Sequence, residues 1–186
     1  RLTHGRPTSK QHWLGILGLA AELNVDLDPL LLTDALRSDY STVRHAAVTQ
    51  LRDEQLPLII EALDDPSDRL FAAAIERLRD QPWSMLQPGV DAIMDRGWHE
   101  LAPTRREAML HLRPRWQQVH YLLARFEAEP TLQAFWLRQL TLWCDRQYQM
   151  VDHETPKAER DLLMARLKQL GAKGLLPGDS VRQVVG

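Results

Sequence analysis

The apolar residues of this chain recur at the spacing of an α-helix along most of its length. In the segment 10–23, for example, Trp13, Ile16, Leu17 and Ala20 fall on one face of a helix. Strand patterns are nearly absent, and no Asn-Gly or Asp-Gly hairpin turn occurs. The pattern predicts an all-α protein of about ten helices. They are expected at 10–23, 28–37, 41–52, 54–64, 67–79, 83–95 (with Pro88-Gly89 as a potential break), 103–112, 114–128, 130–149 and 156–170.

Several of these helices carry start and stop residues. Asp28 can cap free backbone N–H groups, and Pro29 suits a first helical position because no N–H is needed there. Pro156 has the same place in the last helix, which Gly171 ends. We therefore expect a polar lead-in over residues 1–9, a single repeat domain over 10–170, and a loosely ordered tail over 171–186.

An internal repeat is the most informative feature of the pattern. Adding 27 to the numbers of a set of apolar residues gives an apolar residue each time. A fixed period of this size indicates stacked helix pairs, because one pair cannot bury both of its faces without neighbours. The clearest repeats are 28–53 and 54–80. The set comprises Ala35, Leu36, Val43, Ala46, Ala47, Val48 and Leu51, which return as Ala62, Leu63, Leu70, Ala73, Ala74, Ile75 and Leu78.

These two segments resemble the HEAT repeat family, especially its short bacterial form. The residues that carry the resemblance are Asp39 and Val43-Arg44 in the first repeat, and Pro57 and Asp65 in the second. Leu70-Phe71 replaces the Val-Arg pair of the family in the second repeat, and beyond Gln81 the spacing is no longer 27. The resemblance implies a right-handed α-solenoid of stacked antiparallel helix pairs. Its second helices would line a concave face that meets a partner.

Charge and composition narrow the function classes. The 186 residues carry a net charge of -2 and have a pI near 6.4, which argues against a general affinity for nucleic acid or anionic membrane. The single cysteine, Cys144, cannot form an internal disulfide, so we expect a reducing, cytoplasmic location. No apolar run is long enough to span a membrane. Because the chain opens with Arg1, we expect it to be part of a longer protein, and the resemblance to the short bacterial HEAT form implies a bacterial one.

No catalytic, cofactor or metal site is predicted. The segment Trp98-His99-Glu100-Leu101 begins like a zinc-protease motif, but Pro103 stands where the second His is needed. His111 and His120 lack ligands at helical spacing. Cys144 lies next to Trp143 within a predicted helix, where a buried, unreactive thiol is expected.

Tryptophans and arginines supply the candidate binding residues. Trp136 and Trp143 share a helical stripe and belong to a core face. Other tryptophans lie near helix ends, where they either fill gaps between repeats or stay partly exposed as interface anchors. The arginines of the stretch 104–116 either pair with nearby acids or contact an acidic peptide or a phosphate backbone. The candidate binding set is Trp98, Arg105, Arg106, Arg113, Arg115 and Trp116, with Arg44 and Arg69 on the expected concave face.

The sequence favours a non-catalytic scaffold that binds a protein or peptide. One alternative is a nucleic-acid-binding domain resembling the HEAT-like DNA glycosylases. Another is the repeat region of a larger enzyme or sensor. A lyase or chaperone for a tetrapyrrole rests on fold analogy alone. We expect any dedicated site in the irregular half, around Trp98 to Trp116, with the regular repeats as its frame.

Overall fold

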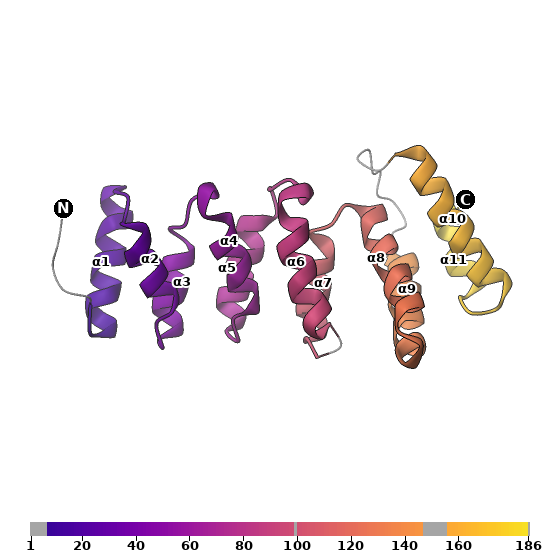
Figure 1. Cartoon of the computed structure of the whole chain (residues 1–186), viewed down its shortest axis with the longest axis horizontal. Helices are drawn as coiled ribbons and strands as arrows, with labels where there is room; N and C mark the ends of the chain where they lie inside the picture. The colour runs from indigo at the N-terminus through magenta and orange to yellow at the C-terminus, as the bar shows by residue number, and fades with distance from the viewer. Residues whose placement is uncertain (1–6, 99, 147–155, 186) are drawn as a thin grey trace. The chain divides into compact units, whose positions relative to one another are not determined.

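The structure, a computed structural model, describes residues 7–98, 100–146 and 156–185. These residues form helices and no strand, which confirms the all-α prediction (Figure 1). Contacts divide the chain into two compact units, Arg1–Leu112 and Arg113–Gly186. The single repeat domain over 10–170 stays a prediction. Unit 1 contains α1 (Lys10–Leu23), α2 (Pro29–Leu36), α3 (Ser41–Val48), η1 (Asp53–Gln55), α4 (Leu56–Glu61), η2 (Ala62–Asp64), α5 (Asp68–Leu78), α6 (Trp83–Gly97) and α7 (Pro103–His111). Unit 2 contains α8 (Arg115–Ala128), η3 (Pro130–Leu132), α9 (Gln133–Arg146), α10 (Lys157–Ala172) and α11 (Gly178–Val185).

Helix starts follow the local residues that predict them. Asp28 caps α2, and its carboxylate accepts a hydrogen bond of 2.8 Å from the backbone N–H of Leu30, while Pro29 is the first helical residue. Ser9 caps α1 in the same way through the N–H of His12. The helix α1 ends at Asn24, which adopts the left-handed conformation with φ of 50°.

Three elements differ from the sequence prediction. The helix α3 ends at Val48, four residues before the expected end. The helix α6 runs unbroken through Pro88-Gly89. The expected loose tail contains α11, whose Val181 is buried, with its Cγ2 atom 3.3 Å from the place of a Cβ at Gly171. The Gly171 that marks a helix end in the sequence thus gives α11 room to pack against α10.

The 27-residue repeat is visible in the structure of unit 1. The helices α2 and α4 begin 27 residues apart, and so do α3 and α5. Burial repeats with the same offset: Val43 and Leu70 are buried, as are Ala47 and Ala74. The helix α6 again begins 27 residues after α4, but it is longer, and α7 begins only at Pro103. The change of spacing beyond Gln81 therefore arises between the starts of α6 and α7, and the longer α6 accounts for much of it.

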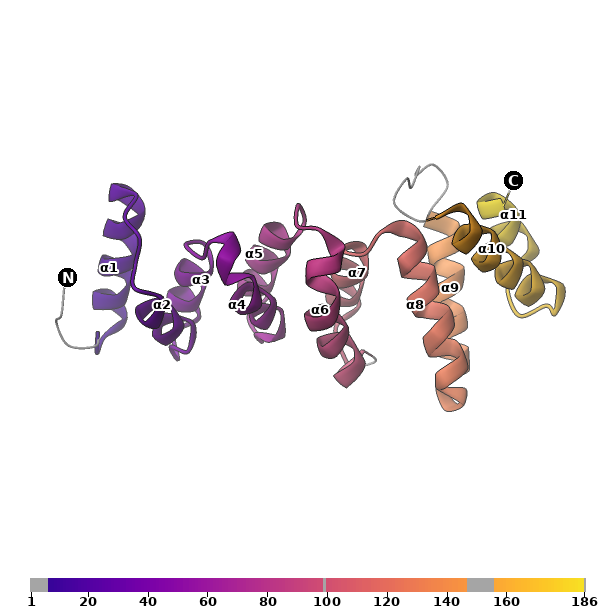
Figure 2. The same cartoon turned by 45° about the horizontal axis from the view of Figure 1, so that its top comes forward.

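Unit 1 is packed as two rows of helices. The first helix of each pair contacts the second, so that α2 packs on α3, α4 on α5, and α6 on α7 (Figures 1 and 2). The second helices also contact one another in the order α1, α3, α5 and α7. The helix α1 therefore has the place of a second helix in this row. Small residues such as Ala47 and Ala74, both fully buried, permit the close approach.

The four helices of unit 2 enclose an aromatic core. The helix α8 packs on α9 and α10, and α11 packs on α9 and α10. Trp136 and Trp143 of α9 are buried, which confirms the core face predicted for them. The indole N–H of Trp143 donates to Oε1 of Gln118 at 3.1 Å, and Nε2 of Gln118 donates to the carbonyl of Arg113 at 2.9 Å. These bonds satisfy the buried amide of Gln118.

Gly89 marks the closest approach of α6 to α4. A Cβ at this position would lie 2.7 Å from Cγ2 of Ile60, so we expect Gly89→Ala to lower the stability by about 2 kcal/mol. Gly18 in α1 is the matched control, because nothing lies within 4 Å of its added Cβ. Gly18→Ala should raise stability by up to about 1 kcal/mol, since alanine favours a helix interior. Opposite shifts of the thermal midpoint, followed by circular dichroism, would verify this; equal shifts would contradict it.

Candidate functional site

Arg44, a candidate binding residue, forms hydrogen bonds and an ion pair with other residues of unit 1. Its guanidinium binds the carboxylate of Asp65 in the next repeat, with Nε to Oδ2 at 2.6 Å and Nη2 to Oδ1 at 3.1 Å. Its Nη1 donates to the backbone carbonyls of Ser38 and Asp39, at 2.8 and 3.2 Å. Both charged side chains are largely buried. The residue that carries part of the HEAT resemblance thus joins the α2–α3 connection to the turn that precedes α5.

Arg105 makes the corresponding contact one repeat further on. Its Nη1 and Nη2 donate to the carbonyls of Asp65 and Pro66, at 2.6 and 3.0 Å, and these residues follow Ser38 and Asp39 by 27 positions. Phe71 has the position equivalent to Arg44, and the guanidinium of Arg105 lies 4.7 Å from the centre of its ring. Arg105 also pairs with Asp68 at 2.8 Å. The second repeat has Phe71 in place of an arginine at this position, and Arg105 of α7 supplies the guanidinium instead.

Electrostatics of this turn follow from the pairing. Burial raises the pKa of Asp65, but hydrogen bonds from Arg44 and from the N–H of Ser67, with the charges of Arg44 and Arg105, outweigh it and lower the pKa overall. The hydrogen bond to Asp65 likewise raises the pKa of Arg44. Asp65 is therefore ionised at neutral pH, and the turn holds matched charges.

The other candidate side chains are mostly buried. Trp98 in unit 1 and Trp116 in unit 2 are buried, which fits gap filling and leaves a partner no access to their rings. Arg113 is buried, with its guanidinium 4.0 Å from the ring centre of Tyr121. Arg115 lies 5.5 and 5.7 Å from the ring centres of Trp116 and Trp143.

Two candidates of unit 1 remain. Burial lowers the pKa of the half-buried Arg106. Arg69 is exposed on α5, and its charge adds to burial in lowering the pKa of His45 on α3. Of the eight candidates, the structure brings Arg44 and Arg105 to one turn, where both make contacts within unit 1, and it puts Arg115 against the ring of Trp116. Arg69 stays a candidate for partner contact.

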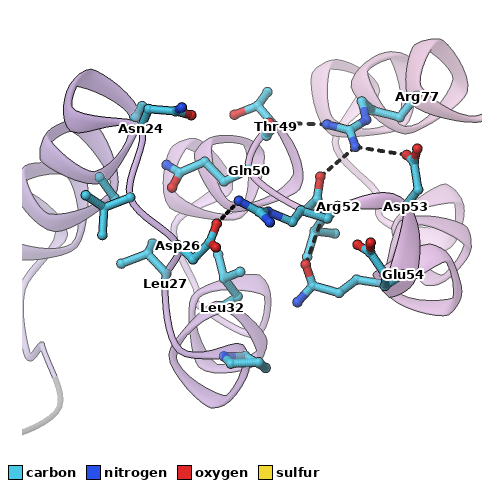
Figure 3. A pocket seen from close by; sticks show the side chains of 16 residues that line it. Asn24, Asp26, Leu27, Leu32, Thr49, Gln50, Arg52, Asp53, Glu54 and Arg77 are labelled. Carbon is cyan, nitrogen blue, oxygen red and sulfur yellow. Dashed lines mark hydrogen bonds and ion pairs between the residues drawn. The ribbon is translucent and has the colours of Figure 1, made fainter. Parts of the chain in front are cut away.

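One pocket of unit 1, which sequence reasoning did not find, has a volume of about 840 Å³. It lies in the regular half of the chain and not around Trp98 to Trp116. Its walls come from the C-terminal end of α1, the α1–α2 connection, the end of α3, and η1 (Figure 3). The lining residues are Ala20, Ala21, Asn24, Val25, Asp26, Leu27, Pro29, Leu32, Thr49, Gln50, Leu51, Arg52, Asp53, Glu54, Gln55 and Arg77.

Two arginines of the pocket are already engaged. Arg52 and Asp26 form an ion pair across the pocket, and both side chains are exposed (Figure 3). Arg77 donates to the carbonyls of Leu51 and Thr49 at the end of α3, at 2.5 and 3.4 Å, and lies 3.6 Å from Asp53. The pocket therefore combines apolar side chains, such as Leu27 and Leu32, with exposed charged side chains at its rim. The sequence clue was the relation of Gln50 to Arg77 by the 27-residue offset, which puts both at one edge of the stack.

Other chemistry finds little support in the described residues. Among them, no group of three or more His, Cys, Asp or Glu side chains could hold a metal ion, and the adjacent Asp152, His153 and Glu154 of the sequence lie outside them. Cys144 is buried, as expected; burial, with a smaller contribution from Asp145, raises its pKa to about 12. None of the described helices is long and apolar enough to span a membrane.

Comparisons with known proteins leave the identification open. No protein-family model matches the chain, and searches of curated proteins and of solved structures gave no match. Membership of the HEAT family therefore stays a prediction, resting on the residues of the two clear repeats.

Proposed function

We propose that this chain is a non-catalytic protein-interaction module built as a right-handed α-solenoid of HEAT-like helix pairs, and that unit 1 binds a peptide segment of a partner in its pocket. The observation that carries the proposal is the open pocket of about 840 Å³, which combines apolar and polar side chains. Exposed Val25 and half-buried Leu27 offer apolar contacts, and the rim offers polar ones.

The engagement of the arginines supports protein over nucleic acid as the partner. A phosphate backbone needs arginines that are available to it. Arg44 and Arg105 bind carboxylates and backbone carbonyls within unit 1. Arg113 and Arg115 of unit 2 lie over aromatic rings. The nucleic-acid alternative therefore has less support, although it predicts binding to a labelled DNA oligonucleotide at low salt.

Selection from a random peptide display library on the immobilised chain tests the proposal. Ala21→Trp would fill the pocket, because Ala21 is exposed and lines it. Ala72→Trp is the matched control, an exposed alanine on α5 outside the pocket lining. We expect selected peptides to lose binding to the first variant only. A library that yields no binding peptide would contradict the proposal, and loss with Ala72→Trp alone would move the site to the face lined by second helices.

A further inference from the structure

The pocket of unit 1 lies where two helices end. Residues 20–24 close α1, and residues 49–51 follow the last turn of α3. The C-terminal end of a helix carries a partial negative charge from its unpaired carbonyls, which favours a cation nearby. The last turn of α1 contains no basic residue, and that of α3 contains only His45, whose pKa is lowered by burial and by Arg69.

The side chains that donate hydrogen bonds to α1 and α3 in this pocket differ in charge. At the end of α3, Arg77 brings a guanidinium to the carbonyls of Thr49 and Leu51. On the α1 side of the pocket, the 27-residue offset gives Gln50, whose neutral amide donates at 2.7 Å to the carbonyl of Leu17, six residues before the end of α1. A cation therefore lies at the end of α3, whereas the last turn of α1 contains no basic residue and Gln50 brings no charge to it.

Carboxylates add to the negative potential of the two helix ends. Asp26, Asp53 and Glu54 line the pocket. Asp26 is held by Arg52 in an ion pair whose side chains are 60% and 64% exposed, and such a pair is weak and easily exchanged. Asp53 is 71% exposed and lies 3.6 Å from Arg77. Glu54 is exposed on η1. Against Arg52 and Arg77, which also line the pocket, these three carboxylates leave an excess of one negative charge, and Glu54 is the carboxylate beyond the two pairs. The pocket therefore favours positive charge.

We propose that the partner segment bound in this pocket is basic: an extended peptide that puts one Lys or Arg at the end of α1, beside Gln50 and Asp26, and another beside Glu54. Alternate side chains of an extended segment would contact apolar lining residues such as Val25 and Leu27. The inference rests on the proposed function and adds the chemical class of the partner to it.

Binding of two fluorescein-labelled octapeptides to the full chain, followed by fluorescence anisotropy, tests the charge. One alternates Lys with Val, and the other replaces each Lys by Glu. We expect the Lys peptide to bind at least about ten-fold more tightly, with affinity falling as salt rises. A tighter Glu peptide, or no binding of either peptide, would overturn the proposal.

Charge reversal locates the contact. Glu54→Lys should weaken the Lys peptide about ten-fold. Asp161→Lys, at an exposed position of α10 in unit 2, makes the same change in net charge and should alter affinity less than about two-fold. Equal losses would mean that the peptide follows the overall charge and would overturn the assignment to the pocket. Circular dichroism confirms that each variant is folded.

Gln50→Arg supplies the missing cation from within the chain. We expect it to weaken the Lys peptide, because Gln50 lines the pocket and a guanidinium at this position repels a second cation there. Unchanged affinity in a folded Gln50→Arg variant would contradict a cation site at α1.

Other occupants of the pocket give different results. If the chain self-associates in sedimentation experiments and Glu54→Lys abolishes that association, the pocket binds a second copy of the chain and the proposal is overturned. Neutral or acidic peptides that Ala21→Trp displaces would leave the proposed function intact and remove only its basic partner.

Discussion

Replacement of Arg44 by methionine is expected to lower the free energy of unfolding by about 3 kcal/mol. The change keeps the aliphatic stem but removes the guanidinium, so the buried carboxylate of Asp65 loses both hydrogen bonds from Arg44. The carbonyls of Ser38 and Asp39 lose their donor at the same time. Most of the cost comes from a charge left buried beside a turn. Urea unfolding followed by circular dichroism measures it, with an unchanged m-value indicating an unchanged unfolding transition.

The control for Arg44 is Arg69→Met on α5, which removes the same charge from an exposed position. Its effect should stay within about 0.5 kcal/mol. Acid titration gives an independent readout. Because the pKa of Asp65 is lower in the folded state, its contribution is present above the unfolded pKa of about 3.9 and is lost as pH falls through the folded value. Arg44→Met should therefore lose less stability in acid than the parent chain. An Arg44→Met variant that matches Arg69→Met in urea and in acid would contradict the role of Arg44.

The elements of this fold could be predicted because their determinants are local. Asp28 caps α2 through the N–H of a residue two positions away, and Ser9 caps α1 over three positions. The 27-residue offset shared by Val43 and Leu70 can also be recognised from the sequence, because each apolar position of one helix pair has the same environment in the next pair. The end of α3 and the helix α11 were missed, since both depend on packing between elements and carry no strong end signal.

The candidate site could not be predicted in the same way. The partners of Arg44 and Arg105 lie 21 and 37 residues away, and a sequence does not say which acid a given arginine will reach. Arg105 also donates to the carbonyl of Asp65, a hydrogen bond that the side chain of Phe71 cannot make. The sequence does not show that these two residues lie side by side. The pocket is formed by connections and helix ends, whose side chains follow no periodic pattern.

Replacement of Trp98 by alanine is expected to cost about 4 kcal/mol of stability. The side chain follows the end of α6 and is 1% exposed, so its removal leaves a large cavity that unit 1 can fill only in part. Trp83, which is half-buried at the start of the same helix, provides the comparison. Trp83→Ala should cost about 1 kcal/mol, because less apolar surface is removed from the core. Urea unfolding of both variants measures the difference.

Urea unfolding and peptide binding, measured on the same Trp98→Ala variant, separate the two roles that the sequence left open for Trp98. An interface anchor keeps its ring exposed in the free protein, so its loss weakens binding and leaves stability nearly unchanged. A core residue shows the reverse: Trp98→Ala should unfold more easily, yet bind selected peptides normally at temperatures where it remains folded. Trp98→Ala with parental stability and lost peptide binding would establish an anchor and contradict the burial seen here. The distinction bears on the peptide site itself, because a core Trp98 leaves partner contact to the pocket at the ends of α1 and α3 and to exposed residues such as Arg69.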